Sequence, residues 1–240
     1  MSAERAVGLV IHTYDWSESS RIAVIFTREF GKVRVLAKGG RRIKSNFEVA
    51  LDLLNVCSMV LLRKNSEGLE LLTEARIEER FAGLKTNLRA LYAAYYVAEL
   101  LDLGTQDHDP HPGLFDAALQ TLRSFNSNEV ELSLDTMRFE LAWLREIGYA
   151  PELANCSRCG SGGNTAGWYF SSSSGGLVCD PCRSGVRDSR KISDESLTWL
   201  RDAGSSELPG QQHRNELRQL LSHYVSHHLG KRPKLLNYIL

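Results

Sequence analysis

The sequence predicts a multi-domain α+β protein, in which a five-stranded β-barrel precedes an all-α region that carries a small four-cysteine insert. Three observations predict this class. The first 78 residues contain short runs rich in β-branched and aromatic residues, separated by turns, but beyond residue 80 apolar residues recur every three or four residues. Two Cys-x-x-Cys pairs then lie in a stretch rich in glycine and serine. We expect the domains to be residues 1–79 (barrel), 80–151 (first helical part), 152–190 (cysteine insert) and 191–240 (second helical part and tail).

Five strands separated by polar or glycine-containing turns are expected in the first part. They are Val7–Thr13, Ile22–Thr27, Lys32–Lys38, Val49–Arg63 and Leu69–Ala75. Five short strands suit a small closed barrel, and the oligonucleotide-binding (OB) barrel is the commonest five-stranded binder. Cys57 lies inside the apolar fourth strand, so we expect it to pack as a small core side chain.

The helical periodicity begins near Phe81, and Gly104 is expected to end the first helix. Two further helices are expected over Leu114–Phe125 and over residues 134–144, the latter stopped at Gly148. After the insert, Ser193 is expected to cap a helix, and Gly230 to end a last helix over residues 217–228. His223 and His227 are four residues apart there, but no glutamate between them completes a metalloprotease motif, which favours a polar helix face.

Positive charge is concentrated between Arg28 and Lys44, where seven cationic residues stand against one acid, Glu29. The whole chain has no net charge, so a strongly basic nucleic-acid binder is excluded and any polyanion site must arise from this local segregation. Gly39 and Gly40 interrupt the segment and allow close approach of a ligand. Such a group of cations suits a polyanion. The alternative is a solvated strand edge, where lysines prevent edge-to-edge pairing.

Two cysteine pairs give the most specific chemical signal. Nineteen residues separate Cys156-Ser-Arg-Cys159 from Cys179-Asp-Pro-Cys182, and each Cys-x-x-Cys turn places two thiolates on one side of a tight knuckle. Trp168–Phe170 and Gly176–Val178 between them can form a small hairpin. An insert with so little apolar content needs a cross-link to fold. Four cysteine ligands would fill all positions around a tetrahedral metal ion, which indicates a structural site. We therefore predict a zinc-ribbon-like module with one structural Zn²⁺ ion held by Cys156, Cys159, Cys179 and Cys182.

Motifs of catalysis are missing from the sequence. It contains no phosphate-binding loop of the Gly-x-x-x-x-Gly-Lys-Ser/Thr type, no Gly-x-Gly-x-x-Gly, no Gly-x-Ser-x-Gly and no carboxylate–histidine cluster. We therefore expect a binding protein and not an enzyme. No apolar run reaches the length of a membrane span and no export signal is visible, so the cytoplasm is the expected compartment.

Taken together, these parts resemble the RecO family of bacterial recombination mediators. The resemblance extends over essentially the whole chain. Its most specific parts are the run Ala37-Lys-Gly-Gly-Arg-Arg-Ile-Lys-Ser45 after the third strand and the spaced cysteine quartet. Ile43 departs from the family, which often has proline there, so we expect the loop that carries Lys44 to be more flexible in this chain.

The resemblance implies a role in DNA repair by homologous recombination. Proteins of this family bind single- and double-stranded DNA, anneal complementary strands and work with RecR to load the recombinase RecA on DNA coated by single-strand-binding protein, whose acidic tail they contact. Family DNA binding is attributed to the basic face of the barrel, which in this chain is Lys38, Arg41, Arg42 and Lys44, with Lys32 and Arg34 on the strand leading to them.

Two questions stay open at this point. Tyr14, Trp16 and Phe47 lie near the expected loop ends and could stack on bases or simply cover the barrel. The alternative function is a zinc-containing protein–protein adaptor that makes no direct contact with DNA.

Overall fold

The computed structural model describes residues 2–42, 45–63, 68–127, 131–162, 167–202, 204 and 210–239. The chain divides into two compact units, Met1–Val130 and Glu131–Leu240. The division falls inside the stretch 80–151 that was expected to form the first part of one helical domain. Two of its helices pack within the first unit, and the third packs within the second unit.

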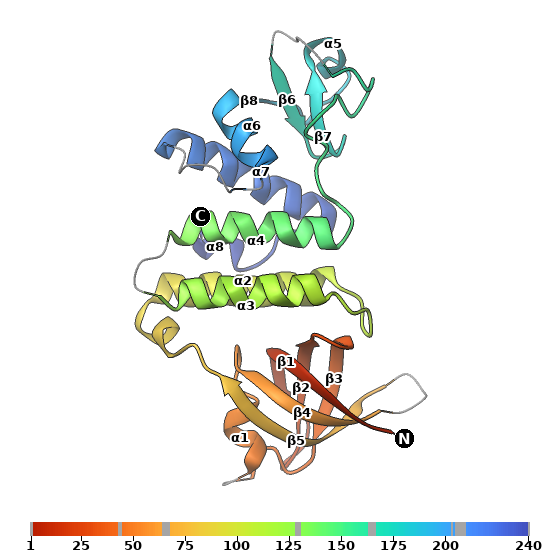
Figure 1. Ribbon diagram of the computed structural model, residues 1–240, viewed down its shortest axis with the longest axis vertical. Helices are drawn as coiled ribbons and strands as arrows, with labels where there is room; N and C mark the ends of the chain where they lie inside the picture. Colours follow the sequence, from red (N-terminus) through yellow and green to blue (C-terminus); the bar gives the residue numbers. More distant parts are fainter. Residues whose placement is uncertain are drawn as a thin grey trace. The chain divides into compact units, whose positions relative to one another are not determined.

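The first unit is built on a closed barrel with the strand order β1-β2-β3-β5-β4 (Figure 1). The β3 and β5 strands pair in parallel, and the other neighbours, including β4 with β1, are antiparallel. This arrangement confirms the expected five-stranded barrel of the OB type. The strands are β1 (Ser2–Asp15), β2 (Arg21–Thr27), β3 (Gly31–Ala37), β4 (Val56–Arg63) and β5 (Glu70–Glu79).

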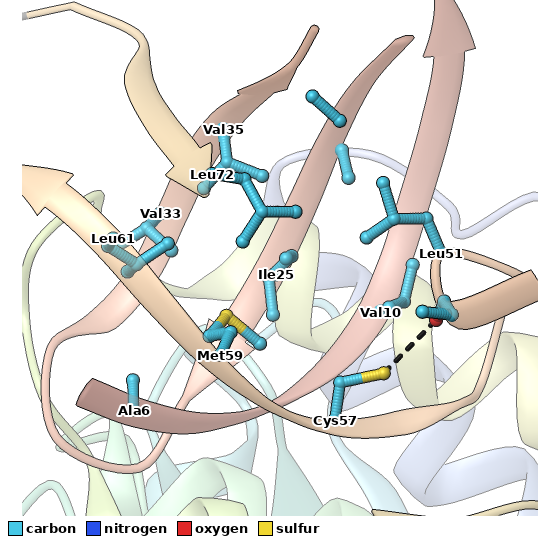
Figure 2. Packing of buried hydrophobic residues seen from close by; sticks show 13 residues of the cluster. Ala6, Val10, Ile25, Val33, Val35, Leu51, Cys57, Met59, Leu61 and Leu72 are labelled. Atoms are coloured by element: carbon cyan, nitrogen blue, oxygen red, sulfur yellow. Dashed lines mark hydrogen bonds between the residues drawn. The ribbon is translucent and has the colours of Figure 1, made fainter. Parts of the chain in front are cut away.

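Alternating side chains fill the barrel. Val33, Val35 and Ala37 of β3 are fully buried, as the period-two pattern predicts. Figure 2 shows Val33 and Val35 with Cys57 in this core, where the Cys57 thiol donates a hydrogen bond to the carbonyl of Ala50 at 3.1 Å. Burial raises the pKa of Cys57 to about 11, so the thiol stays protonated at neutral pH. The prediction that Cys57 is a core residue is confirmed.

The expected strand Val49–Arg63 is wrong in its first part. A short helix, α1 (Asn46–Ala50), comes first, and β4 begins only at Val56. The Ser45 hydroxyl caps α1 by accepting from the backbone N–H of Phe47, and Leu51 behind the helix is buried in the barrel core. The run is mostly apolar, and a short apolar run fits a buried helix turn as well as a strand.

Two helices, α2 (Leu88–Gly104) and α3 (Pro112–Phe125), complete the first unit, preceded by the 3₁₀ turn η1 (Ala82–Thr86). The first helix was expected to begin near Phe81. It begins at Leu88 because the Asn87 side chain accepts hydrogen bonds from the backbone N–H groups of Arg89 and Ala90. The α3 helix lies where its apolar stripe placed it.

The second unit combines helices with a three-stranded sheet of order β7-β6-β8 (Figure 1). The hairpin between the cysteine pairs is confirmed, and so is Ser193 as the cap of α6, because its hydroxyl accepts from the N–H of Ser196. In the described part of the chain, no helix combines the length and the apolar character that a membrane span requires. The elements are α4 (Leu132–Glu146), β6 (Trp168–Ser171), β7 (Gly176–Cys179), α5 (Asp180–Arg183), β8 (Arg190–Ile192), α6 (Asp194–Arg201), α7 (Gln211–Leu229) and α8 (Leu236–Ile239).

Candidate nucleic-acid interface and metal site

Lys32, which is predicted from the sequence to contact DNA, is buried in the structure. Its side chain is only 6% exposed, and Nζ donates to the carbonyls of Asp102 and Thr105 at 2.5 and 2.8 Å. The carboxylates of Asp102 and Asp107 each lie 3.6 Å from the same nitrogen. A buried ammonium needs such partners to offset its lost hydration, and all of them come from within the first unit. Lys32 therefore joins β3 to the end of α2.

Arg34 is also paired, although it is partly exposed. Its Nε donates to the Asp107 carboxylate at 2.9 Å, and this hydrogen bond is the main reason why the pKa of the guanidinium is raised. Asp107 belongs to the loop between α2 and α3, which runs beside β3, since the N–H of His108 donates to the Lys32 carbonyl at 2.9 Å. Arg34 is therefore part of a contact inside the first unit and is not a free cation.

The loop between α2 and α3 packs this closely because residue 31 is a glycine. Gly31 has a φ of +67°, and a Cβ there would lie 2.0 Å from the carbonyl oxygen of Asp109. The sequence carries a signal for this packing, namely the three acids in and before the loop, Asp102, Asp107 and Asp109. The acids at Asp102 and Asp107 neutralise the cations of β3.

The loop after β3 carries the cations that remain accessible. Lys38 and Arg42 are exposed, and among the described residues neither side chain has a hydrogen bond or ion pair. Arg41 is 37% exposed, donates to the carbonyl of Ser17 at 2.7 Å and lies 3.3 Å from the Asp15 carboxylate. An ion pair this exposed contributes only about 0.2–1 kcal/mol, so a phosphate can replace Asp15 as the partner. Lys44 lies outside the described residues.

Three aromatic side chains near this loop differ in how much of their surface is exposed. The β1–β2 loop lies against it, because the Arg41 N–H donates to the Ser19 carbonyl at 3.1 Å, and Trp16 in that loop is 62% exposed. Tyr14 is 38% exposed at the end of β1. Phe47 packs against the barrel core instead, so it covers the barrel and offers little stacking surface. We name Trp16, Lys38, Arg41 and Arg42 the barrel rim.

The four predicted cysteine ligands come together in the second unit. Their sulfur atoms all lie within 4.8 Å of one another, and no other such group of possible metal ligands occurs among the described residues. The sulfurs of Cys159 and Cys179 are 3.7 Å apart. A tetrahedral metal with bonds of about 2.3 Å to sulfur requires a sulfur–sulfur edge of about 3.8 Å. The cluster therefore fits a four-coordinate metal ion and has the wrong spacing for a disulfide.

Backbone geometry around the first cysteine pair supports thiolate ligands. Gly160 has a φ of +72°, which lets its N–H turn back to the Cys156 carbonyl at 2.8 Å. Burial raises the pKa of the Cys156 thiol, but hydrogen bonds from the N–H groups of Cys179, Cys159 and Arg158 outweigh it, and the pKa falls to about 6. Metal binding requires the thiolate, so these N–H groups prepare the site before a metal arrives.

The fold and the two sites define a class: an α+β protein in which an OB-type barrel with a basic rim is followed by a helical unit that carries a cluster of four cysteines with the spacing of metal ligands. Comparison with protein families narrows the class. The model described as "Recombination protein O N terminal" matches residues 1–81, and the model described as "Recombination protein O C terminal" matches residues 85–237. The chain therefore belongs to the recombination protein O (RecO) family.

Individual relatives agree with the family models. A protein of Rhodopirellula baltica named DNA repair protein RecO is 37% identical over 206 residues, which are 85% of this chain and 76% of the relative. The proteins of that name from Bacillus pumilus and Anaeromyxobacter dehalogenans are 30% and 29% identical, and each comparison covers 97% of this chain. The similarity thus includes both the barrel and the cysteine module.

Proposed function

We propose that this protein acts in DNA repair as a non-enzymatic recombination mediator, which binds single- and double-stranded DNA and anneals complementary strands. In this role it works with RecR, contacts the acidic tail of single-strand-binding protein and helps to load the recombinase on coated DNA. The relatives named DNA repair protein RecO support the repair role. The observation that carries the proposal is the barrel rim, where accessible cations lie beside an exposed tryptophan on a chain without net charge.

The mechanism follows from electrostatics. Two strands repel each other until their phosphates are neutralised, and annealing also requires the bases to remain free. Lys38, Arg41 and Arg42 would pair with phosphates of one strand, and Trp16 would stack on a base without sequence preference. Arg41 exchanges Asp15 for a phosphate at little cost because both partners are solvated.

The metal in this proposal is one structural Zn²⁺ ion. Zinc prefers four thiolates in a tetrahedron, and four protein ligands leave no position for a substrate. The module has a small core whose buried members are Cys156, Val178, Cys179 and Val186. A cross-link must therefore supply much of the stability of the module. The ion would shape the second unit and take no part in annealing.

A second candidate is the adaptor that binds proteins and not DNA. The pairing of Lys32 and Arg34 with carboxylates favours it, since it removes two of the expected DNA contacts. The adaptor would dock partners through the cysteine module and the helices, while the barrel rim remained solvated.

Strand annealing separates the two candidates. Complementary oligonucleotides carrying a fluorophore and a quencher are mixed with the protein, with and without bound single-strand-binding protein. A mediator is expected to accelerate annealing in both cases and to shift the mobility of labelled single strands. If neither annealing nor mobility responds to the protein, the mediator proposal fails and the adaptor stands.

A further inference from the structure

A second group of accessible cations lies on the second unit. Two adjoining hollows of about 350 and 470 Å³ are lined by residues of α7 and of the segment that ends in β8, and they share Asp188 and His223 as lining residues. We name the lining cations and histidines the β8–α7 surface: Arg158, Arg187, Arg190, Lys191, His223 and His227.

The arginines and the lysine of this surface are not neutralised by neighbours. Within the described residues, none of these four side chains has a hydrogen bond or an ion pair, in contrast to Lys32 and Arg34 on the barrel. The described part of the chain thus places more unpaired Lys and Arg side chains here than on the barrel rim. A cluster of solvated cations with no partner of its own attracts a polyanion from solution.

Two acids line the same hollows, and neither binds a cation of the surface. Asp188 accepts from the hydroxyls of Ser171 and Ser173 and from the N–H of Ser173, at 2.6 to 2.8 Å. Glu216 accepts from the N–H of Ser193 at 3.1 Å and from the hydroxyls of Ser193 and Ser196. Their charges reduce the net potential, but their oxygens are occupied by neutral donors, so the guanidinium groups remain available to an external anion.

The shape of the hollows distinguishes between possible polyanions. An acidic peptide with an apolar anchor would need exposed apolar surface, but the apolar residues beneath the first hollow, Phe170 and Leu220, are only 3% and 8% exposed. Phosphate groups need only cations and hydroxyl donors, and Ser174 lines the second hollow together with Arg158 and Arg187. The chemistry of the lining therefore favours a phosphodiester backbone.

We propose that the β8–α7 surface binds the phosphates of a second DNA strand, independently of sequence, while the barrel rim binds the first. The inference rests on the proposed DNA-binding function and extends it. One molecule would then hold two strands and lower their mutual repulsion, which is the condition for annealing.

The number of short oligonucleotides bound per chain tests this proposal. A labelled twelve-residue oligothymidylate is titrated at low salt into the zinc-loaded full chain and into Arg187→Glu/Arg190→Glu. The unaltered protein is expected to bind two oligonucleotides per chain and the variant one. At 0.1 M salt each lost contact with a single strand raises Kd by a factor of about 10^0.7, so the affected site weakens about 25-fold.

Control variants with the same change in net charge show whether a loss of binding is specific to the β8–α7 surface. Arg89→Glu/Lys231→Glu changes the net charge equally at exposed sites that line neither hollow, and it should still bind two oligonucleotides. Equal zinc content and circular dichroism show that the Arg187→Glu/Arg190→Glu chain is folded, and Arg187→Gln/Arg190→Gln should show a smaller loss.

The proposal is overturned if Arg187→Glu/Arg190→Glu still binds two oligonucleotides. It is also overturned if the unaltered protein has a single site that Arg41→Glu/Arg42→Glu alone abolishes. A third contradicting result is that Arg187→Glu/Arg190→Glu loses binding only to an Asp-rich peptide. A single site in the unaltered protein that Arg187→Glu/Arg190→Glu abolishes would instead support this surface and refute the barrel rim, so the two proposals fail separately.

Discussion

A Cys179→Ser protein is expected to lose its bound metal and the ordered structure of the cysteine module, whereas the unaltered protein should carry about one Zn²⁺ per chain. Binding of a structural Zn²⁺ contributes roughly 10–16 kcal/mol in small zinc modules, more than the whole stability of many domains. Cys179 also donates its N–H to the Cys156 sulfur at 3.4 Å, and its side chain is buried in the small core of the module. Removing its thiolate therefore removes both a ligand and the main support of that core.

Elemental analysis and thermal unfolding of purified proteins check this expectation. Cys57→Ala is the matched control, because Cys57 is a cysteine of the barrel core and not of the cluster. It should keep its zinc and lose only modest stability, since one small buried side chain is shortened. A Cys179→Ser protein with full zinc content and unchanged unfolding would show that the four sulfurs do not form a structural metal site.

The second large effect is expected at a buried ion pair between α4 and α7. Glu140 is fully buried, and Arg218, 7% exposed, donates a hydrogen bond to its carboxylate. Arg218→Met removes the positive partner and leaves the carboxylate in the core. Stranding a buried charge in this way costs about 3–5 kcal/mol, which should lower the urea midpoint of the second unit sharply.

Tryptophan fluorescence can follow this unit selectively. Trp143 and Trp199 are buried in it, and Trp16 on the barrel can be replaced by Phe in every variant to remove its signal. In the double variant Glu140→Leu/Arg218→Met the stranded charge is gone, so most of the lost stability should return. If the double variant is as unstable as Arg218→Met, the loss comes from packing and not from the loss of the charge that faces the Glu140 carboxylate.

Most of the secondary structure could be predicted from local sequence patterns. The strands of the barrel, the hairpin between the cysteines and the caps of α6 and α7 depend on residues close together in the sequence, such as Ser193 and Gly230. Several short elements were missed or misassigned, and β8 and α1 show why. The β8 strand has only three residues, which is too short for any period, and the apolar residues of α1 fit either kind of structure.

The metal site was predictable because its ligands are marked by spacing, but the basic site was predictable only in part. The sequence shows where the cationic residues of the barrel are concentrated, but it does not show which acids and carbonyl groups they bind. Lys32 binds groups that are 70 and 73 residues away, and no local pattern shows which acids a fold will bring to a lysine. The accessible cations on β8 and the preceding loop were missed for a related reason: each is ordinary alone, and only the packing of α7 beside them makes a surface.

The central claim is that cations of the barrel rim bind DNA phosphates, and a salt titration tests it most directly. Affinity for labelled single-stranded DNA is measured between 0.05 and 0.3 M salt in the Arg187→Glu/Arg190→Glu background, so that the β8–α7 surface cannot mask a loss. Adding Arg41→Glu/Arg42→Glu should raise Kd about 25-fold at 0.1 M salt and make the slope of log affinity against log salt less negative by about 1.4, whereas adding Arg89→Glu/Lys231→Glu should change neither. Equal affinity and equal slope in the two charge-matched variants would contradict the account.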